Sequence, residues 1–418
     1  MASDSTIPAN PASAGPEGLS TPATPAVMAL PADATPLSGD ASSTRKFYTI
    51  TASLREIYDT NVDTTHSNPQ TSLETELSPS ILVDFPTEDS DFSARYTLDT
   101  TYYANVSNNN NNNNNNTTSG TLQYNQEFNA QYNHTFSERL QLNLAEDFRY
   151  FYEPSLFQSV GTNYQNGNYI ANIFNGTVTM QWLPRFSTQT TYSNTIVRYN
   201  ETSVGNNQNN NENTGSQVFI FTLFPKISLT FGGIGDGATY LGSTRGYTAY
   251  TGFVGAQWQP LPSLNLSGRV GGTYTETDLN QTLITPYTNL SIDWTLGARS
   301  ELTFNYTHEV VPTDLIGADA ETADRVSSNF RYDITPNLST HLQGILTNVV
   351  IPSALANSNS NLGNNYTEID YALDTGFTYH YNSYLDFNCG ITLSGVSADI
   401  STNGYNRSQT YLGVRGTY

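Results

Sequence analysis

The last stretch of the chain, Thr410-Tyr411-Leu412-Gly413-Val414-Arg415-Gly416-Thr417-Tyr418, alternates apolar or small residues with polar ones and ends on an aromatic ring. Counted back from Tyr418, every second residue falls on one face and Arg415 falls on the other, because side chains along a β-strand alternate with a period of two. A strand with one apolar face needs neighbours on both edges. We interpret this stretch as the closing strand of a membrane β-barrel.

The same alternation recurs from residue 46 onward. Between residues 48 and 55 the even positions are apolar and the odd positions are polar, and 92–99, 140–145, 301–306 and 370–379 repeat the pattern. One apolar face per segment is typical of strands that are buried or lipid-facing on one side only. The sequence therefore predicts an all-β protein.

The connections between these segments alternate between short and long. The short ones lie at 85–91, 134–138, 183–185, 224–226, 259–263, 297–300, 335–337 and 381–383. The long polar ones lie at 59–71, 105–119, 151–167, 200–213, 234–245, 277–285, 312–322, 352–364 and 397–403. Short periplasmic turns and long external loops are typical of outer-membrane barrels. The strand boundary that the pattern defines least well lies between residues 218 and 234, where Pro225 is either in a turn between two strands or in a bulge of one strand.

We therefore expect a transmembrane antiparallel up-and-down β-barrel of about eighteen strands, with about sixteen as the alternative count. This barrel occupies residues 45–418, and both of its ends lie on the periplasmic side. Residues 1–44 are rich in Ala, Pro, Ser and Thr and have few bulky side chains, so we expect a disordered N-terminal segment. The last strand should pair with the first, at 47–58, and close the ring.

The composition agrees with a barrel and excludes several other classes. Charged residues are only 13% of the chain, aromatic residues reach 12%, and no apolar run is long enough for a transmembrane helix. The mean hydropathy of -0.44 fits a barrel, because only alternate strand residues face lipid. A net charge of -21 speaks against nucleic acid as a partner.

An exported protein is expected to begin with a basic segment followed by an apolar one, whereas this chain begins Met1-Ala2-Ser3-Asp4-Ser5. We expect the signal peptide to be absent from this version of the chain, either because it was removed or because the start was misassigned.

If the apolar face contacts lipid, the opposite face lines the interior. The candidate pore-lining residues on that face are Arg55, Arg95, Asp99, Asp147, Arg149, Arg269, Asp293, Arg331, Asp333, Asp374, Asp386 and Arg415. A barrel of this width is too wide for its side chains to fill, so the interior is either an aqueous channel or is plugged by loops. Charges on such a wall tune which solutes pass. The alternative is that these charges only neutralise one another across neighbouring strands.

Aromatic residues lie near the predicted strand ends, where we expect two girdles at the membrane interfaces. They are Tyr102, Tyr103, Tyr150, Phe151, Tyr152, Trp182, Tyr199, Phe224, Trp258 and Tyr381. The single cysteine, Cys389, alternates with Phe387 and Ile391 and is interpreted as a small lipid-facing residue.

No catalytic, metal-binding or cofactor-binding pattern is present. The five histidines are widely separated, although His341 or His380 with Asp374 remains open as a catalytic pair. The glycine-rich run at 232–237 is not followed by a helical pattern and is interpreted as the flexible end of a strand. The Asn-rich runs at 108–116 and 206–213 are interpreted as solvated loop insertions, with a carbohydrate-facing surface as the alternative. We expect no enzyme activity and no cofactor.

The opening strand reads Leu54-Arg55-Glu56-Ile57-Tyr58-Asp59-Thr60-Asn61-Val62, followed by a loop and then by Leu77-Ser78-Pro79-Ser80-Ile81-Leu82-Val83. This resembles the opening of the outer-membrane β-barrel porin families of Gram-negative bacteria, including barrels linked to exopolysaccharide systems. The resemblance implies an integral barrel of the Gram-negative outer membrane, in contact with its lipid and lipopolysaccharide. It also implies insertion by the barrel-assembly machinery, which would read Leu412, Val414 and Tyr418 as its signal. The terminal Tyr departs from the commoner Phe.

Three functions follow as hypotheses. The first is a porin-like barrel that allows passive diffusion of small solutes or ions. The second is a non-conducting barrel that acts as a surface anchor or as a component of exopolysaccharide export, in contact with surface polysaccharide. The third is a secreted soluble β-protein that binds carbohydrate, which requires two packed sheets and does not require regular loop lengths.

Overall fold

The structure is a computed structural model that describes residues 47–107, 118–152, 156–157, 168–200, 208–278, 281–315, 317–353, 355, 365–399 and 404–418. The expected disordered segment at 1–44 and the Asn run at 108–116 lie outside these residues. Within the described ranges, no helix is both long enough and apolar enough to cross a bilayer.

One sheet contains all eighteen strands of the residues that the structure describes. They are β1 (Tyr48–Asp59), β2 (Ser72–Pro86), β3 (Ser90–Ser107), β4 (Thr118–Ser137), β5 (Leu140–Phe151), β6 (Tyr169–Leu183), β7 (Phe186–Tyr199), β8 (Asn210–Phe224), β9 (Ile227–Tyr240), β10 (Gly246–Leu261), β11 (Leu264–Thr277), β12 (Thr282–Thr295), β13 (Ser300–Pro312), β14 (Ala320–Thr335), β15 (Leu338–Pro352), β16 (Asn365–Asn382), β17 (Leu385–Ala398) and β18 (Tyr405–Thr417). The predicted count of eighteen is confirmed, and the alternative count of sixteen is wrong.

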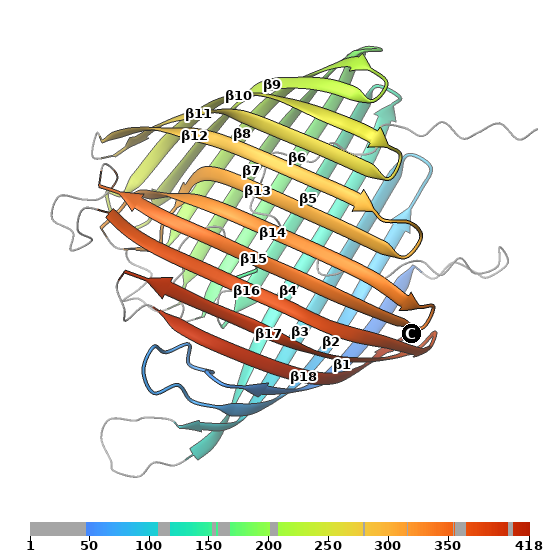
Figure 1. Cartoon of the computed structure of the whole chain (residues 1–418), viewed down its shortest axis with the longest axis vertical. Helices are drawn as coiled ribbons and strands as arrows, with labels where there is room; N and C mark the ends of the chain where they lie inside the picture. The colour runs from blue at the N-terminus through green and yellow to red at the C-terminus, as the bar shows by residue number, and fades with distance from the viewer. Residues whose placement is uncertain are drawn as a thin grey trace, which may run out of the picture.

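The sheet closes on itself (Figure 1). Each strand pairs antiparallel with the next one along the chain, and β1 pairs with both β2 and β18. The register from Thr51 opposite Thr417 to Asp59 opposite Gln409 is the expected pairing of the first and last strands. The β1–β18 pairing joins the two strands that would otherwise form the edges of the described sheet.

Short turns lie at one end of the barrel, together with residues 47 and 418, and long loops lie at the other. Pro225 forms a turn with Lys226 between β8 and β9. Residues 218–234 are therefore two strands joined as a hairpin and not one strand with a bulge. This suits a residue that presets φ and donates no ladder hydrogen bond.

Several predicted loops are shorter than expected, among them 312–322, whose last three residues belong to β14. Residues 234–240 belong to β9 and pair with β8 and β10, whereas residues 282–285 belong to β12 and pair with β11. The interpretation of 232–237 as a strand end is wrong for the same reason: this run lies in the interior of β9. Likewise Asn210 to Asn213 are the first residues of β8 rather than loop. Pairing on both sides of a strand outweighs the weak strand preference of Gly and Asn.

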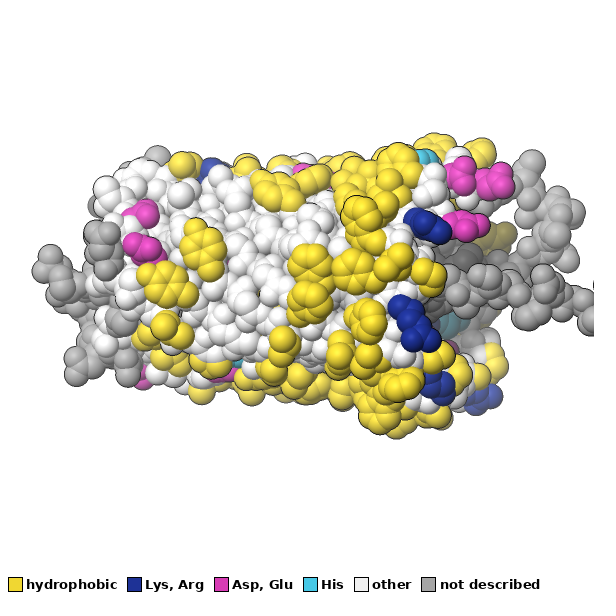
Figure 2. All heavy atoms as spheres, turned by 90° about the horizontal axis from the view of Figure 1, so that it is seen from above, with side chains coloured by type: hydrophobic (Ala, Val, Ile, Leu, Met, Phe, Trp, Pro, Cys, Tyr) yellow, Lys and Arg dark blue, Asp and Glu magenta, His cyan; other side chains and the backbone are white. Residues whose placement is uncertain are grey.

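The two faces of the sheet differ in polarity. Large apolar side chains such as Leu54, Leu77 and Leu412 point outward and are exposed, whereas the alternate positions are buried or half-buried and mostly polar. Figure 2 shows the outer apolar side chains, which gather most densely toward one end of the barrel. Cys389 lies on this outer face, as predicted.

The aromatic girdles are confirmed only in part. Trp182, Phe224, Trp258 and Tyr381 are exposed at the short-turn end. By contrast, Tyr103, Phe151 and Tyr199 fall on the inner face, where Tyr103 and Tyr199 are buried. Their neighbours Tyr102 and Tyr150 alternate with them and face outward, because adjacent residues of a strand cannot share a face.

Candidate pore and its loop constriction

Charged residues are concentrated on the inner face of the barrel wall. The inward-facing arginines of the strands are Arg55, Arg95, Arg149, Arg269, Arg325, Arg331, Arg407 and Arg415. Inward-facing carboxylates include Asp59, Glu74, Glu76, Asp99, Glu127, Asp147, Glu212, Asp236, Asp293, Glu301, Glu309, Glu321, Asp333, Glu368, Asp370, Asp374 and Asp386. Carboxylates clearly outnumber arginines on this face.

Several residues predicted as pore-lining lie in ion pairs. Arg415 Nη2 lies 2.6 Å from Asp386 Oδ2 across the β17–β18 pair, and Arg331 Nε lies 3.6 Å from Asp333 Oδ1 along β14. Arg149 is paired with Asp147 along β5. The structure thus contains ion pairs of the kind expected if the inward-facing charges neutralise one another.

Other predicted residues have different partners. Arg55 Nε donates to Glu76 Oε1 at 2.9 Å, and Asp374 Oδ2 lies 2.6 Å from His341 Nε2. The Arg269 guanidinium lies 5.3 Å from the centre of the Phe253 ring. Asp293 accepts a hydrogen bond from Ser291 Oγ at 3.4 Å. Arg95 and Asp99 share the inner face of β3 and stand opposite Asn129 and Asn125 of β4. That all these residues line a conducting pore stays a prediction.

The seam between β1 and β18 contains a buried ion pair that the sequence analysis did not single out. Asp59 is fully buried, and its Oδ2 accepts from Arg407 Nε at 2.7 Å and from Gln409 Nε2 at 3.0 Å. Its Oδ1 accepts from the backbone N–H of Asn61 at 2.8 Å. Strand alternation places both side chains on the inner face, but only the observed register brings them together.

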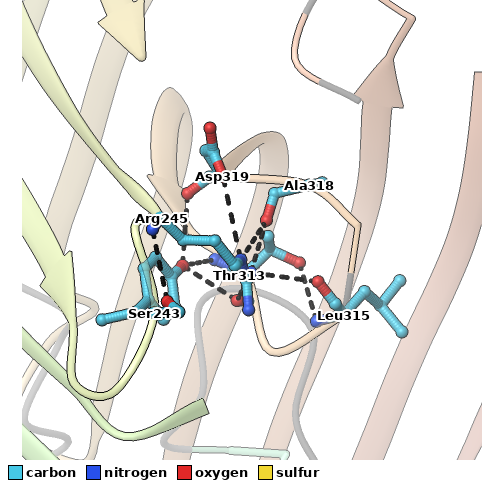
Figure 3. A network of polar contacts seen from close by, with 7 residues as sticks. Ser243, Arg245, Thr313, Leu315, Ala318 and Asp319 are labelled. Carbon is cyan, nitrogen blue, oxygen red and sulfur yellow. Dashed lines mark hydrogen bonds and ion pairs between the residues drawn. The ribbon is translucent and has the colours of Figure 1, made fainter. Parts of the chain in front are cut away.

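The connection between β13 and β14 contacts Arg245, which lies in the connection between β9 and β10 (Figure 3). Arg245, in the connection between β9 and β10, donates from Nε to the Ala318 carbonyl at 2.9 Å and from Nη2 to the carbonyls of Thr313 and Leu315 at 3.2 and 3.0 Å. Its Nε also lies 3.8 Å from Asp319 Oδ1. These carbonyls belong to a loop that starts four strands away, so the loop crosses inward instead of standing clear of the barrel.

Tyr199 of β7, Tyr240 of β9 and Gln208, which precedes β8, also contact this connection. Tyr240 OH donates to the Thr313 carbonyl at 2.9 Å and accepts from the Thr313 N–H at 2.7 Å. Tyr199 OH donates to the Asp314 carboxylate, and Gln208 Nε2 donates to the Asp314 carbonyl at 2.6 Å. We name residues 313–315 and 317–319 the cross-mouth loop.

A second loop segment approaches the opposite wall. Leu156 packs against the inward-facing side chains of β15 to β18, including Ile345, Ala372 and Tyr405. Arg325 Nη2 donates to the Phe157 carbonyl at 2.8 Å. The long-loop end is therefore narrowed from two sides.

The electrostatics of the cross-mouth loop centre on Asp319. This carboxylate is fully buried, and burial raises its pKa to about 6, an effect that the Arg245 guanidinium only partly offsets. The protonation of Asp319 therefore changes near pH 6.

The described part of the chain contains no group of three or more His, Cys, Asp or Glu side chains that could hold a metal ion.

His341 is paired with Asp374, but Thr392 Oγ1 donates to that carboxylate at 2.6 Å and not to the imidazole. His380 is paired instead with Asp386. A hydroxyl-to-imidazole contact, which nucleophilic catalysis needs, does exist between Ser90 Oγ and His134 Nδ1 at 2.6 Å. No Asp or Glu contacts that imidazole among the contacts of the described residues. That the chain is not an enzyme stays a prediction.

Comparisons with known proteins gave matches only at the level of structure. No protein-family model and no curated protein matches the sequence. Similar solved structures include an outer membrane protein and a porin. OccAB3 of Acinetobacter baumannii is 10% identical over 89% of this chain and 98% of that chain, with a TM-score of 0.43. The outer membrane protein OpdK from Pseudomonas aeruginosa is 10% identical over 89% and 98%, with a TM-score of 0.44. A BenF-like porin from Pseudomonas fluorescens Pf-5 is 9% identical over 90% and 100%, with a TM-score of 0.45. None of these scores reaches 0.5, so the assignment as a closed barrel follows from the strand pairing of this chain.

Proposed function

We propose that the chain is a porin-like barrel of a Gram-negative outer membrane that allows passive diffusion of small solutes or ions. The observation that supports this most strongly is the closed ring of eighteen strands with exposed apolar side chains outside and charged side chains inside. In a bilayer, only helices and closed barrels satisfy all backbone polar groups. Barrels of this strand number are wide enough to leave an aqueous channel.

The proposed channel prefers cations. Inward-facing carboxylates outnumber inward-facing arginines, and a wall of one predominant charge raises the local concentration of counter-ions. Asp293 and Glu301 are exposed on the inner face near the short-turn end, where solutes that cross the barrel would pass them.

A non-conducting barrel, either a surface anchor or a component of exopolysaccharide export, is the second candidate. The cross-mouth loop and the Leu156–Phe157 segment favour it, because both reduce the open area of the mouth. The soluble carbohydrate-binding protein requires two packed sheets, and the sheet is instead a single closed ring.

The proposed partners are outer-membrane lipid and lipopolysaccharide along the apolar outer face, the barrel-assembly machinery and, for the second candidate, surface polysaccharide. Leu412 and Tyr418 are exposed on the outer face of β18, as an assembly signal has to be before insertion. Val414 lies on the same face between them.

Conductance across a planar bilayer under a gradient of KCl tests the proposal. We expect discrete conductance steps and a reversal potential whose sign shows preference for K⁺ over Cl⁻. Correctly folded protein that gives no steps would favour the non-conducting barrel, and steps that favour Cl⁻ would contradict the cation preference.

A further inference from the structure

Two neighbouring strands of the barrel are joined over only part of their length. β12 and β13 pair from Thr295 opposite Glu301 to Thr288 opposite His308, and their pairing stops there. Toward the long-loop end, residues 282–287 of β12 still pair with β11, and residues 309–312 of β13 still pair with β14. Figure 1 shows β13 curving away from β12 at this end. We name the interval between these two described segments the ladder break.

The end of β13 bends into the barrel. Val310 is at an even position, as are the outward-facing residues of β13, yet its side chain packs against a buried cluster that includes Ala238 of β9 and Ala249 of β10. Thr313, which follows β13, accepts at its carbonyl from Tyr240 OH of β9 at 2.9 Å. Neither β9 nor β10 is a neighbour of β13 in the sheet, so these contacts are made across the interior. The last residues of β13 therefore leave the wall that β12 continues.

Proline lies on both sides of the ladder break. Pro286 is in the segment of β12 that has no partner on β13, and Pro312 is the last residue of β13. Proline donates no ladder hydrogen bond and is found in sheets at edges, at strand ends and at bulges. The sequence therefore favours an edge at this place in an otherwise continuous ring.

The ladder break lies at membrane depth. From Trp294, which is exposed at the short-turn end, β12 rises roughly 16 Å to Thr288 at the usual strand tilt, and the apolar band of a membrane is roughly 25 Å thick. The break thus begins inside this band, on its long-loop side. Backbone groups without a ladder partner are costly in lipid. A break at this depth weakens the wall, so we looked for a role that would offset the cost.

Apolar side chains flank the ladder break on both faces of the wall. On the outer face, Ile284 has 78% of its surface exposed and lies beside Pro286. On the inner face, the neighbouring side chains belong to two buried apolar clusters, one of which also contains Val310. These inner-face residues are Leu283, Tyr287, Val218, Ile220 and Phe253. A molecule that moves from one face to the other would meet apolar groups on both sides.

We propose that the ladder break is a lateral portal through which an apolar molecule dissolved in the membrane enters or leaves the barrel interior. This inference rests on the proposed function, because it needs a barrel that spans a membrane, and it adds a second route to diffusion through the mouth. An apolar molecule concentrates among lipid tails and avoids water, so it reaches the outer face of the wall most readily. No hydrogen bond between β12 and β13 has to be broken for it to pass.

Disulfide formation tests the ladder break itself. Leu290→Cys with Tyr306→Cys places thiols on directly opposed outward residues of β12 and β13. Pro286→Cys with Val310→Cys would place them on opposed residues only if the same register continued. Both pairs are made in a Cys389→Ser background and oxidised. We expect a disulfide in the first pair and free thiols in the second. Equal disulfide formation in the two pairs would show a continuous ladder and overturn the proposal.

Tryptophan fluorescence tests passage through the portal. Tyr287→Trp is made in a background whose three native tryptophans are replaced by Phe, and the folded barrel is inserted into phosphatidylcholine vesicles. The probe is dibromostearate, whose bromine atoms quench tryptophan. We expect the probe to quench Tyr287→Trp and to leave the emission of Ile173→Trp, on the inner face of β6, nearly unchanged. Pro286→Val, which restores a backbone N–H to the break, should reduce the quenching of Tyr287→Trp.

Three outcomes of the fluorescence test would overturn the portal. They are no quenching of Tyr287→Trp, equal quenching of Ile173→Trp, which would mean that the probe arrives through the aqueous interior, and equal quenching by phosphatidylcholine with the same dibrominated chain, which would mean that lipid tails only fill the break. Protein that does not enter vesicles, or that has no heat-dependent electrophoretic mobility, would instead contradict the proposed function. A folded barrel in vesicles with an unquenched Tyr287→Trp contradicts the portal alone.

Discussion

Leu54 of β1 stands directly opposite Val414 of β18 in the register that closes the barrel. The backbone N–H of Ile50 donates to the Tyr418 carbonyl at 3.1 Å, and the N–H of Tyr418 donates to the Ile50 carbonyl at 2.8 Å. At the other end of the seam, Asp59 is paired with Arg407. The first and last described strands are therefore joined along their whole common length.

The seam predicts a specific disulfide. In a Cys389→Ser background, Leu54→Cys together with Val414→Cys should form a disulfide on mild oxidation, because the Cα atoms of directly opposed residues lie about 4.5–5.5 Å apart, within the range that a disulfide spans. Mass spectrometry of thiol-labelled protein measures it. Leu54→Cys with Leu393→Cys, which lies on β17 and does not face Leu54, is the control and should keep both thiols. Two free thiols in the Leu54–Val414 variant would show that the ring is open there.

The buried seam ion pair predicts a stability change. Asp59→Asn removes the carboxylate that Arg407 and Gln409 contact, and leaves the Arg407 charge less well compensated inside the barrel. We expect the free energy of unfolding to fall by about 2–4 kcal/mol, as for other broken buried pairs. Urea unfolding in lipid vesicles measures it. Asp89→Asn, at the turn between β2 and β3, should change it by less than about 0.5 kcal/mol. Equal effects of the two substitutions would argue against the seam pair.

Removal of Arg245 should release the cross-mouth loop. Arg245→Ala deletes the donors to the carbonyls of Thr313, Leu315 and Ala318, so the backbone amides of 313–315 and 317–319 should exchange with deuterium faster. Single-channel conductance should rise, because the loop no longer crosses the mouth. Arg139→Ala, at the turn between β4 and β5, is the control. Unchanged exchange and conductance in Arg245→Ala would show that this arginine does not hold the loop.

The cross-mouth loop should be held more firmly at acidic pH. Burial raises the pKa of Asp319 from its ordinary 3.8 to about 6, so between these values the held loop binds a proton that a released loop does not. By linkage the held state gains stability as pH falls through about 6 and loses it as pH rises. Hydrogen exchange of the loop, corrected for intrinsic rates, should be slower at about pH 5 than at about pH 7.5. Asp319→Asn should remove this difference, and protection that increases with pH would contradict the assignment.

The charges at the short-turn rim should set ion preference. Asp293→Asn combined with Glu301→Gln removes two inward-facing carboxylates, so the ratio of K⁺ to Cl⁻ permeability should fall. Reversal potentials under a KCl gradient measure that ratio. Glu56→Gln is the matched control, since Glu56 is exposed on the outer face, where Thr75 donates to it. An equal change in the permeability ratio of Glu56→Gln, or no change in that of the double variant, would show that these two carboxylates do not set the ion preference.

Most of the architecture could be predicted from the sequence, because a barrel of this kind is specified by local patterns. The two-residue period assigned the faces of Leu54 and Arg55, and the loop lengths predicted the β1–β18 pairing. β9 was one exception. Its glycines indicated a strand end, whereas pairing with β8 and β10 keeps the run extended through Tyr240. Local propensity was outweighed there by the two neighbouring strands.

The candidate site was less predictable. The two-residue alternation places Arg325 and Glu309 on the inner face, but no feature of the neighbouring sequence distinguishes them from the other inward-facing residues. The cross-mouth loop has no periodic signal, and the contact between Arg245 and the Ala318 carbonyl joins residues 73 positions apart in the chain. Such contacts depend on where the folded wall brings two loops together, and a single sequence does not specify that.

The central claim is that a closed barrel of this chain spans a membrane, and electrophoresis of membrane-fractionated protein with and without boiling tests it most directly. A closed barrel resists detergent at room temperature and unfolds on boiling. The protein should therefore be in the membrane fraction and should migrate differently before and after heating. A soluble fraction whose mobility does not depend on heating would contradict the account.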